Sequence, residues 1–242
     1  MGMNKVWTTH VYDLWSRIYD MTFGLLARSQ QRHAIAQLPF RPGEMVLDLG
    51  VGTGMTMPLY PKSVCVVGVD LSRGMLLRAS RKHQRLRLEN CHLVQGDALR
   101  LPFAASSFDH VVICHTISVV SNPLQVMRWA AHVVRPGGRI VVLNHFQSSC
   151  RCFAALERAL NPLCMWMGWR CDLPLETLLC GEVLELEYCI RLRLADLWKI
   201  AVFRRPLEGR VTGPPVGHPP RIEDAKPVPS GGKATVGFLT GT

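Results

Sequence analysis

Short apolar runs alternate with amphipathic segments through the middle of the chain. The apolar runs are residues 45–49, 64–70, 91–95, 108–114 and 139–144. Between them, two further segments carry apolar side chains at helical spacing, residues 71–82 and 123–134. Short uninterrupted apolar runs are typical of parallel strands that are buried on both faces. The alternation therefore predicts an α/β fold built on a doubly wound, mostly parallel sheet.

The segments that flank this alternation have patterns of their own. Residues 8–38 place apolar side chains at helical spacing up to Pro39, which predicts an N-terminal amphipathic helix. Residues 148–170 predict another helix, rich in Met, Trp and Cys. Residues 182–188 and 197–203 predict two late strands that form an antiparallel pair.

The end of the chain has no periodicity. From Pro206 on, prolines and glycines interrupt every pattern, which predicts a flexible tail. The sequence thus divides into an N-terminal helical segment (1–40), one α/β domain (41–205) and a basic, Pro/Gly-rich tail (206–242). The N-terminal segment is expected to cover the domain as a lid or to contact a membrane.

Charge adds a class of partner to this picture. The 242 residues are 48% hydrophobic and carry a formal net charge of +10. A balance this basic predicts an anionic partner, which is nucleic acid, an acidic substrate or a membrane surface rich in anionic lipid. No apolar stretch is long enough to span a bilayer, so contact with a membrane is expected at its surface.

The nine cysteines and the histidines point away from a metal or redox centre. No two cysteines form a Cys-x-x-Cys pair, which argues against a zinc ribbon or a redox dithiol. No His/Asp cluster with ligand spacing is present, so we expect no metal site. Cys65 and Cys114 fall inside apolar runs, where free thiols behave as small hydrophobic side chains. This usage predicts a reducing, cytoplasmic compartment.

A glycine-rich loop follows the first predicted strand. Gly50, Gly52 and Gly54 allow the backbone to turn tightly and to approach a ligand closely. Related Gly-x-Gly-x-x-Gly loops bind a dinucleotide pyrophosphate, but here the third glycine comes one residue early and Asp48 opens the loop. A carboxylate is unfavourable beside a pyrophosphate and favourable beside a cationic methionine group. The loop therefore favours S-adenosylmethionine (SAM) over a dinucleotide.

Two more carboxylates stand at the ends of predicted strands. Asp70 ends the second strand about twenty residues after the loop, where a carboxylate accepts hydrogen bonds from both ribose hydroxyls. The alternative is an acid that only stabilises the next helix through its dipole. Asp97, followed by Ala98, ends the third strand, from which its carboxylate is expected to reach the adenine amino group.

These motifs resemble those of the class I SAM-dependent methyltransferases over about residues 44–146. Asp-Leu-Gly-Val-Gly-Thr-Gly (48–54), Val-Gly-Val-Asp-Leu-Ser (67–72) and Gly-Asp-Ala (96–98) are similar to that family's first three motifs. The resemblance implies a Rossmann-like fold, SAM as the methyl donor and S-adenosylhomocysteine as a product. It also implies that further residues contact the cofactor, namely Leu71, Met75 and His115.

A narrower resemblance covers about residues 8–203. Residues 11–24, Asn-His-Phe (144–146) and Met-Gly-Trp-Arg-Cys-Asp-Leu-Pro-Leu (167–175) are similar to bacterial phosphatidylethanolamine N-methyltransferases of the membrane-surface type. That family is itself similar to quinone-biosynthesis C-methyltransferases. The resemblance implies stepwise methylation of phosphatidylethanolamine toward phosphatidylcholine. It further implies a phospholipid substrate, an anionic membrane surface as partner, and a peripheral location on the inner membrane surface.

The acceptor site has five candidate residues. Methyl transfer needs a neutral amine held in line with the methyl group, so side chains that orient the amine are sought. Tyr19, His115 and His145 are the catalytic candidates; each histidine is alternatively a semi-buried structural side chain. The lipid head group is expected to contact Tyr12, Tyr19 and His145, and its phosphate Arg170.

Other functions remain open at this level. A C- or O-methyltransferase acting on a quinone precursor or another small hydrophobic acceptor shares the same cofactor site. A membrane-binding or membrane-remodelling protein would depend on its first helix and not on the glycine loop. Nucleic acid is disfavoured, because the fourth strand runs into Cys114-His115-Thr116-Ile117 instead of Asn/Asp-Pro-Pro-aromatic, and no recognition helix is apparent.

Overall fold

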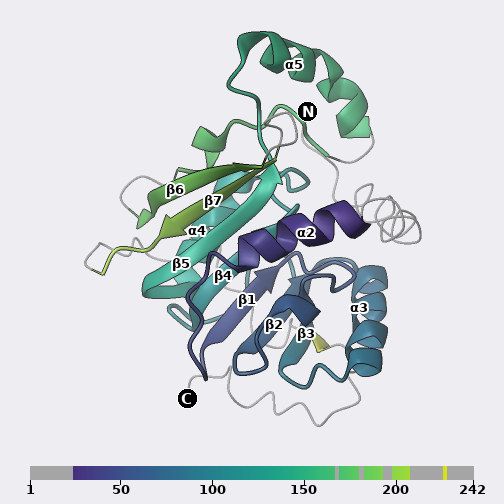
Figure 1. Cartoon of the computed structure of the whole chain (residues 1–242), viewed down its shortest axis with the longest axis vertical. Coiled ribbons are helices and arrows are strands. Elements are labelled where there is room, and N and C mark those ends of the chain that lie inside the picture. The colour runs from purple at the N-terminus through teal and green to yellow at the C-terminus, as the bar shows by residue number, and fades with distance from the viewer. Residues whose placement is uncertain (1–23, 167–168, 180–182, 193–197, 208–225, 228–242) are drawn as a thin grey trace.

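The computed structural model describes residues 24–166, 169–179, 183–192, 198–207 and 226–227, which surround a single sheet (Figure 1). Its parallel strands are β1 (Met45–Leu49), β2 (Cys65–Asp70), β3 (Cys91–Gln95), β4 (Phe108–Cys114) and β5 (Val134–His145). Its antiparallel strands are β6 (Glu185–Leu192), β7 (Trp198–Arg204) and β8 (Lys226–Pro227). The order across the sheet is β6-β7-β5-β4-β1-β2-β3-β8.

Helices cover both faces of the sheet. The helices are α2 (Gly24–Ile35), α3 (Arg73–Leu86), α4 (Pro123–Val133) and α5 (Arg151–Trp166), with short 3-10 turns η1 (Met57–Leu59) and η2 (Leu175–Leu178). One apolar cluster joins α2 and α3 to one face, and a second joins α4 and η2 to the other. Alternate residues of each strand feed the two clusters, as Val46 and Leu47 do in β1.

Local signals in the sequence explain where the helices begin. Ser72 caps α3, because its Oγ accepts a hydrogen bond of 3.1 Å from the Met75 backbone N–H. Asn122 caps α4 in the same way, accepting from the Gln125 N–H at 3.0 Å, and Pro123 occupies the first turn. The Rossmann-like architecture and the antiparallel C-terminal strands agree with the prediction from the sequence.

The boundaries of β5 and of the N-terminal helix differ from the prediction. β5 begins at Val134, directly after α4, and not at residue 139. Gly137 has a φ of +79°, and a Cβ on Gly138 would collide with the backbone oxygen of Asp109, so only glycines let this segment run along β4. Of the predicted helix 8–38, the described part is helical from Gly24 to Ile35, and residues 1–23 lie outside the described residues.

One short segment of the predicted tail is a strand of the sheet. Within the expected flexible tail, Lys226–Pro227 pair with Val94 and Gln95 as β8, and the remaining tail residues beyond 207 lie outside the described residues. In the part of the chain that the structure describes, no helix has the length and apolar character that crossing a bilayer requires.

Candidate functional site

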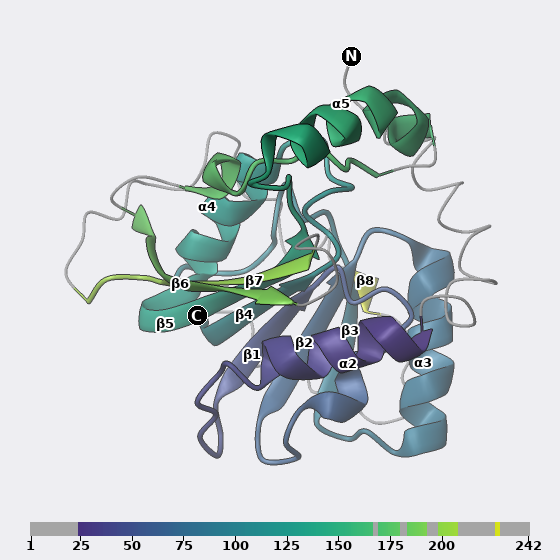
Figure 2. The ribbon, with the colours of Figure 1, turned by 45° about the horizontal axis from the view of Figure 1, so that its top comes forward.

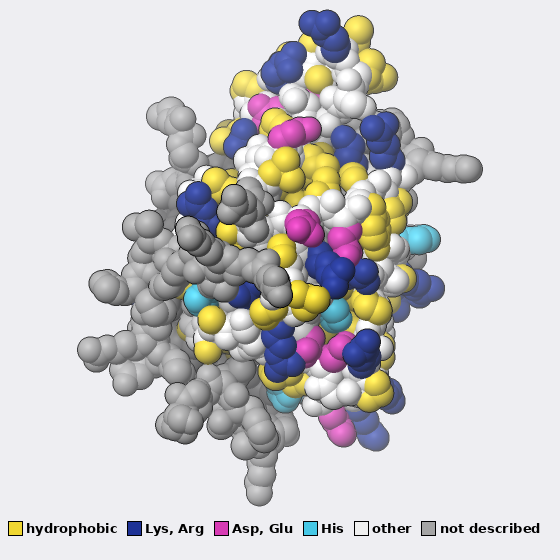
Figure 3. All heavy atoms as spheres, turned by 90° about the vertical axis from the view of Figure 1, so that its left-hand side faces the viewer, with side chains coloured by type: hydrophobic (Ala, Val, Ile, Leu, Met, Phe, Trp, Pro, Cys, Tyr) yellow, Lys and Arg dark blue, Asp and Glu magenta, His cyan; other side chains and the backbone are white. Residues whose placement is uncertain are grey.

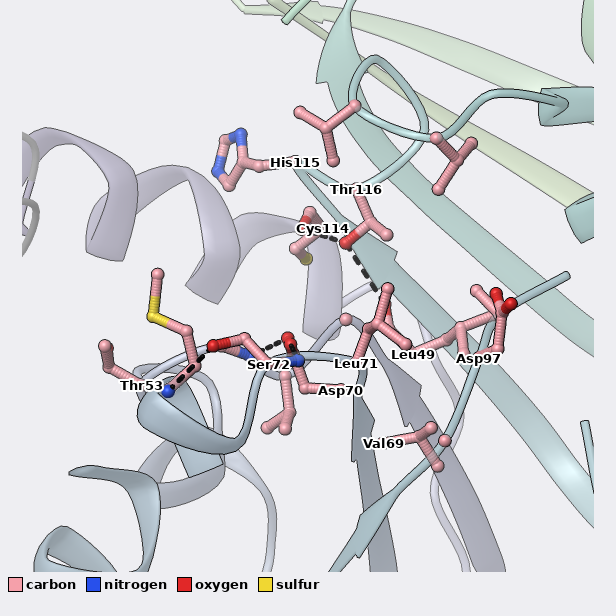
Figure 4. A pocket seen from close by; sticks show the side chains of 18 of the residues that line it. Leu49, Thr53, Val69, Asp70, Leu71, Ser72, Asp97, Cys114, His115 and Thr116 are labelled. Carbon is pink, nitrogen blue, oxygen red and sulfur yellow. Dashed lines mark hydrogen bonds between the residues drawn. The ribbon is translucent and has the colours of Figure 1, made fainter. Parts of the chain in front are cut away.

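A cavity of about 190 Å³ opens at the carboxyl ends of β1, β2 and β4 (Figure 4). This is where ligands bind in open α/β sheets. Its volume is roughly ten times what a single water molecule needs, so it has room for an organic ligand. The loops that follow these three strands and β3, the start of α3 and one residue of α2 form its wall.

The glycine loop forms the floor of this cavity, and each glycine has a separate role. Gly52 lines the cavity with a φ of +55°, and a Cβ there would meet no atom within 4 Å, which leaves the backbone open to a ligand. Gly50 also lines it, with a φ of +78°, and a Cβ there would collide with the Thr116 side chain. Gly54 lies outside the lining and allows close packing, since a Cβ would be 2.5 Å from the Met57 Sδ.

Asp70 connects the glycine loop to the start of α3. Its Oδ2 accepts a hydrogen bond of 2.9 Å from the Gly52 N–H, and its Oδ1 accepts one of 2.8 Å from the Ser72 N–H (Figure 4). The carboxylate also lines the cavity. Because each carboxylate oxygen accepts two hydrogen bonds, Asp70 can hold the loop and still bind a pair of hydroxyls.

Asp48 differs from the expectation that it faces the methionine part of the cofactor. Its side chain is 1% exposed and is not among the residues that line the cavity. It accepts a hydrogen bond of 3.0 Å from the Tyr60 hydroxyl beneath the loop. Burial, opposed by the hydrogen bond from Tyr60, raises the pKa of Asp48 to about 6. An ionised Asp48 thus contributes a negative potential under the loop without direct contact.

The other expected cofactor residues lie in the cavity wall. Asp97 and Ala98 follow β3, and the Asp97 Oδ1 accepts a hydrogen bond of 2.9 Å from the Leu99 N–H, which fixes the turn. Leu71 and Met75 line the wall beside Asp70. Carboxylates for hydroxyl and amino groups therefore alternate with apolar side chains, a combination that suits a nucleoside.

His115 lies at the cavity, directly after β4 (Figure 4). It adopts a φ of +58°, which is uncommon for a residue other than glycine. Burial lowers its pKa to about 4, so the imidazole is neutral at pH 7. No described residue forms a hydrogen bond with either ring nitrogen. The ring makes an edge contact with Trp198 of β7, with 4.9 Å between the ring centroids.

His145 ends β5 and lies behind Trp198, outside the cavity wall. The centroids of the His145 and Trp198 rings are 5.8 Å apart, so Trp198 contacts both histidines. The His145 Nε2 is 3.7 Å from the Glu157 Oε1 of α5, and its ring also contacts Trp169. Burial, reinforced by Lys199, lowers the pKa of His145 to about 4. This places His145 as a support of Trp198 and not as a residue of the cavity.

The remaining candidates are less closely tied to the cavity. Arg170 is half-buried, and its Nε is 3.5 Å from the Asp172 Oδ1. Its backbone N–H donates to the Ser118 oxygen at 2.9 Å, next to the cavity residue Val119. Tyr12 and Tyr19 lie outside the described residues.

Gln31 of α2 is a cavity residue that sequence reasoning missed. It is 6% exposed, and its Oε1 has no hydrogen-bond partner among the described residues. The signal was present, because Gln31 shares the buried stripe of α2 with Ala27, Ala34 and Ile35. A polar side chain in an apolar stripe is expected to have a partner, and a ligand in the cavity can be that partner.

Comparison with known proteins agrees with this geometry. A family model described as a methyltransferase domain matches residues 47–142. The chain is 39% identical over 176 residues to a phosphatidylethanolamine N-methyltransferase of Cereibacter sphaeroides, covering 72% of this chain and 86% of that protein. It is 38% identical over 153 residues to a demethylmenaquinone methyltransferase of Mycobacterium sp. strain KMS, covering 61% of this chain and 64% of that protein.

Solved structures share the fold at lower identity. The YcgJ protein of Bacillus subtilis superposes with a TM-score of 0.64 at 20% identity, covering 75% of this chain and 99% of that protein. A SAM-dependent methyltransferase of Methanosarcina mazei superposes with a TM-score of 0.57 at 17% identity, covering 70% of this chain and 95% of that protein. These likenesses establish the architecture around the cavity.

Proposed function

Because the chain belongs to the SAM-dependent methyltransferases, we propose that it methylates the amino group of phosphatidylethanolamine stepwise toward phosphatidylcholine. The observation that carries this proposal is the relation to the Cereibacter enzyme, which extends well beyond the residues that the family model matches. When bound, SAM supplies an electrophilic methyl group on a sulfonium, and S-adenosylhomocysteine is the product.

The cavity fits this cofactor by its own chemistry. Gly52 leaves room for close approach of a ligand to the backbone. Asp70 offers acceptors for the ribose hydroxyls, and Asp97 with Ala98 would hold the adenine end. The ionised Asp48 favours a cation above the loop. These residues would hold the donor, and the acceptor would approach from the side of His115.

His115 is the residue that we assign to the acceptor amine. An amine must be deprotonated to attack, and its lone pair must be oriented toward the methyl group. Neither ring nitrogen of this neutral imidazole has a hydrogen-bond partner among the described residues, so it can accept a hydrogen bond from the amine N–H in the first two methylations and fix the direction of the amine. Trp198, supported by His145, would hold the His115 ring in place.

The substrate suggests a place in the cell. A phospholipid with two acyl chains leaves the bilayer only at a large free-energy cost, so the enzyme has to work at the membrane surface. A net charge of +10 favours a leaflet that carries anionic lipid. We therefore propose a peripheral position on the inner surface of the cytoplasmic membrane, where the expected contacts also include Tyr12, Tyr19 and Arg170.

A second candidate is methylation of a quinone precursor. The demethylmenaquinone methyltransferase relative favours it, although this chain spans a little under two thirds of that protein. The same donor site would serve, and the acceptor would be a ring carbon or oxygen of an apolar molecule. The difference between the two candidates therefore lies entirely on the acceptor side.

Incubation with isotopically labelled SAM separates the two candidates. Vesicles of phosphatidylethanolamine with phosphatidylglycerol should yield mono-, di- and trimethylated lipid, identified by mass spectrometry. Demethylated quinones are tested in parallel under the same conditions. If SAM binding is intact and label enters only the quinone, the phospholipid proposal is refuted.

A further inference from the structure

Helix α5 exposes an apolar face to solvent. Its large exposed side chains recur at helical spacing and each is between 47% and 69% exposed: Phe153, Leu156, Leu160, Leu163 and Trp166. Cys152, Ala155, Ala159 and Pro162 complete the same face. An apolar face of this extent is uncommon on a soluble protein and marks a site of protein or membrane contact.

The charges on α5 are arranged around this face. Arg151 and Arg158 are exposed along one edge of it. Glu157, the one acidic residue of the helix, points inward, where it accepts a hydrogen bond from the Ser148 N–H at 2.9 Å. Figure 3 shows apolar and basic side chains together at the upper end of the molecule, where α5 lies. An apolar face with arginines at its edge complements an anionic lipid surface.

The position of α5 relates this face to the site. Figure 1 and Figure 2 show α5 beyond the carboxyl end of β5, at the end of the sheet where the cavity opens. Its inner side is anchored by Ala154, Glu157 and Cys164, all buried. Glu157 faces His145, and the rings of His145, Trp198 and His115 follow one another to the cavity. The outer side remains uncovered by any described residue.

We propose that α5 is the element that docks on an anionic lipid bilayer. The helix lies in the plane of the interface, with Phe153, Leu156, Leu160 and Leu163 among the upper acyl chains. Trp166 takes the interfacial position that tryptophan favours, and Arg151 and Arg158 contact lipid phosphates. This assignment rests on the proposed phospholipid function, since it gives that substrate a route from the bilayer to the His115 side of the cavity.

The test is a full-length variant with Leu156→Gln and Leu163→Gln. Glutamine keeps the helix propensity and the approximate length of leucine. We expect about 100-fold weaker binding to phosphatidylethanolamine/phosphatidylglycerol vesicles, with about tenfold from each leucine. The matched control replaces Leu77 and Leu86 of α3, each 44% exposed, by glutamine and should bind as the wild type does. SAM affinity, measured by calorimetry, should be unchanged in both.

A second variant tests the charges. Arg151→Gln with Arg158→Gln should weaken binding to anionic vesicles by about 30-fold and leave binding to purely zwitterionic vesicles nearly unchanged. The α5 variants should also methylate short-chain phosphatidylethanolamine, dissolved below its micelle concentration, at the wild-type rate. A variant that loses methylation of vesicle lipid but keeps methylation of the soluble lipid has lost docking and not the chemical step.

The outcomes distinguish the two proposals. If the wild type binds vesicles through α5 but methylates no phosphatidylethanolamine, the docking assignment is supported and the proposed substrate fails. If the leucine variant binds SAM and vesicles as the wild type does, the docking assignment is overturned. It is also overturned if light scattering shows a wild-type dimer that the leucine variant dissociates while vesicle binding is unchanged.

Discussion

Replacing Asp70 by asparagine tests the donor site. Each oxygen of the carboxylate accepts a hydrogen bond from a backbone N–H, at 2.8 and 2.9 Å. An asparagine retains one acceptor and directs an NH₂ group at the other N–H. A hydrogen bond to a charged group contributes about 1.5–3 kcal/mol. We therefore expect the free energy of unfolding to fall by about 2 kcal/mol, or roughly 4–8 °C in Tm for a chain of this size.

The same substitution removes the acceptor that a ribose hydroxyl needs. Loss of one charge-assisted hydrogen bond weakens SAM affinity by about 10- to 100-fold. Titration calorimetry measures this affinity, and thermal unfolding without SAM measures the stability.

The matched control is Asp109→Asn, at the opposite end of the sheet. Asp109 accepts from the Met45 N–H at 2.8 Å and pairs with Arg135 at 2.6 Å, so this change also removes a carboxylate that holds the backbone. It should lower Tm by a comparable amount and leave SAM affinity unchanged. If Asp70→Asn binds SAM within twofold of the wild type, the ribose assignment is wrong.

Three further predictions concern the cavity. Gly50→Ala should lower the free energy of unfolding by about 2–4 kcal/mol, because the methyl group collides with Thr116 at a φ of +78°, and adding Thr116→Ala should restore part of it in chemical denaturation. The pKa of Asp48 is raised to about 6, so its stabilising contribution is complete below about pH 4 and is lost as the pH rises through 6. Asp48→Asn should flatten that profile of stability against pH; an unchanged profile would contradict the burial argument. His115→Phe should lower kcat by about 10- to 100-fold, with partial recovery in His115→Gln; equal rates in both variants would exclude a hydrogen-bonding role.

Much of the fold was predictable because its signals are local. Uninterrupted apolar runs identify strands that are buried on both faces, and Ser72 and Asn122 mark the helix starts. The start of β5 was missed because Pro136, Gly137 and Gly138 normally interrupt strands. The tight contact of Gly138 with the Asp109 backbone is a long-range fact that no local pattern contains.

The residues that line the candidate site were predictable to a similar degree. The glycine loop, Asp70 and Asp97 occupy fixed positions relative to strand ends, so spacing alone brings them to one cavity. Asp48 was expected to face the cofactor, but its side chain lies outside the cavity lining. Alternation along β1 assigns Asp48 to the face of Val46, whose apolar cluster also contains Tyr60, the hydrogen-bond partner of Asp48. Gln31 reaches the cavity through the packing of α2. The outward face of α5 was not predictable, since amphipathic spacing shows that a helix has two faces and not what covers each.

The antiparallel direction of β7 brings a late part of the chain to the acceptor side of the cavity, whereas earlier residues line the cavity itself. Because β7 runs opposite to β5, its first residue, Trp198, arrives at the end of the sheet where His115 lies. The lining of the cavity ends at Ser121, and among the described residues those assigned to the acceptor, apart from His115, come from residues 144–207. We therefore expect that mutations in this later segment can change which acceptor is methylated without changing the binding of SAM. Exchange of this segment between related enzymes is a direct route to new acceptor specificity.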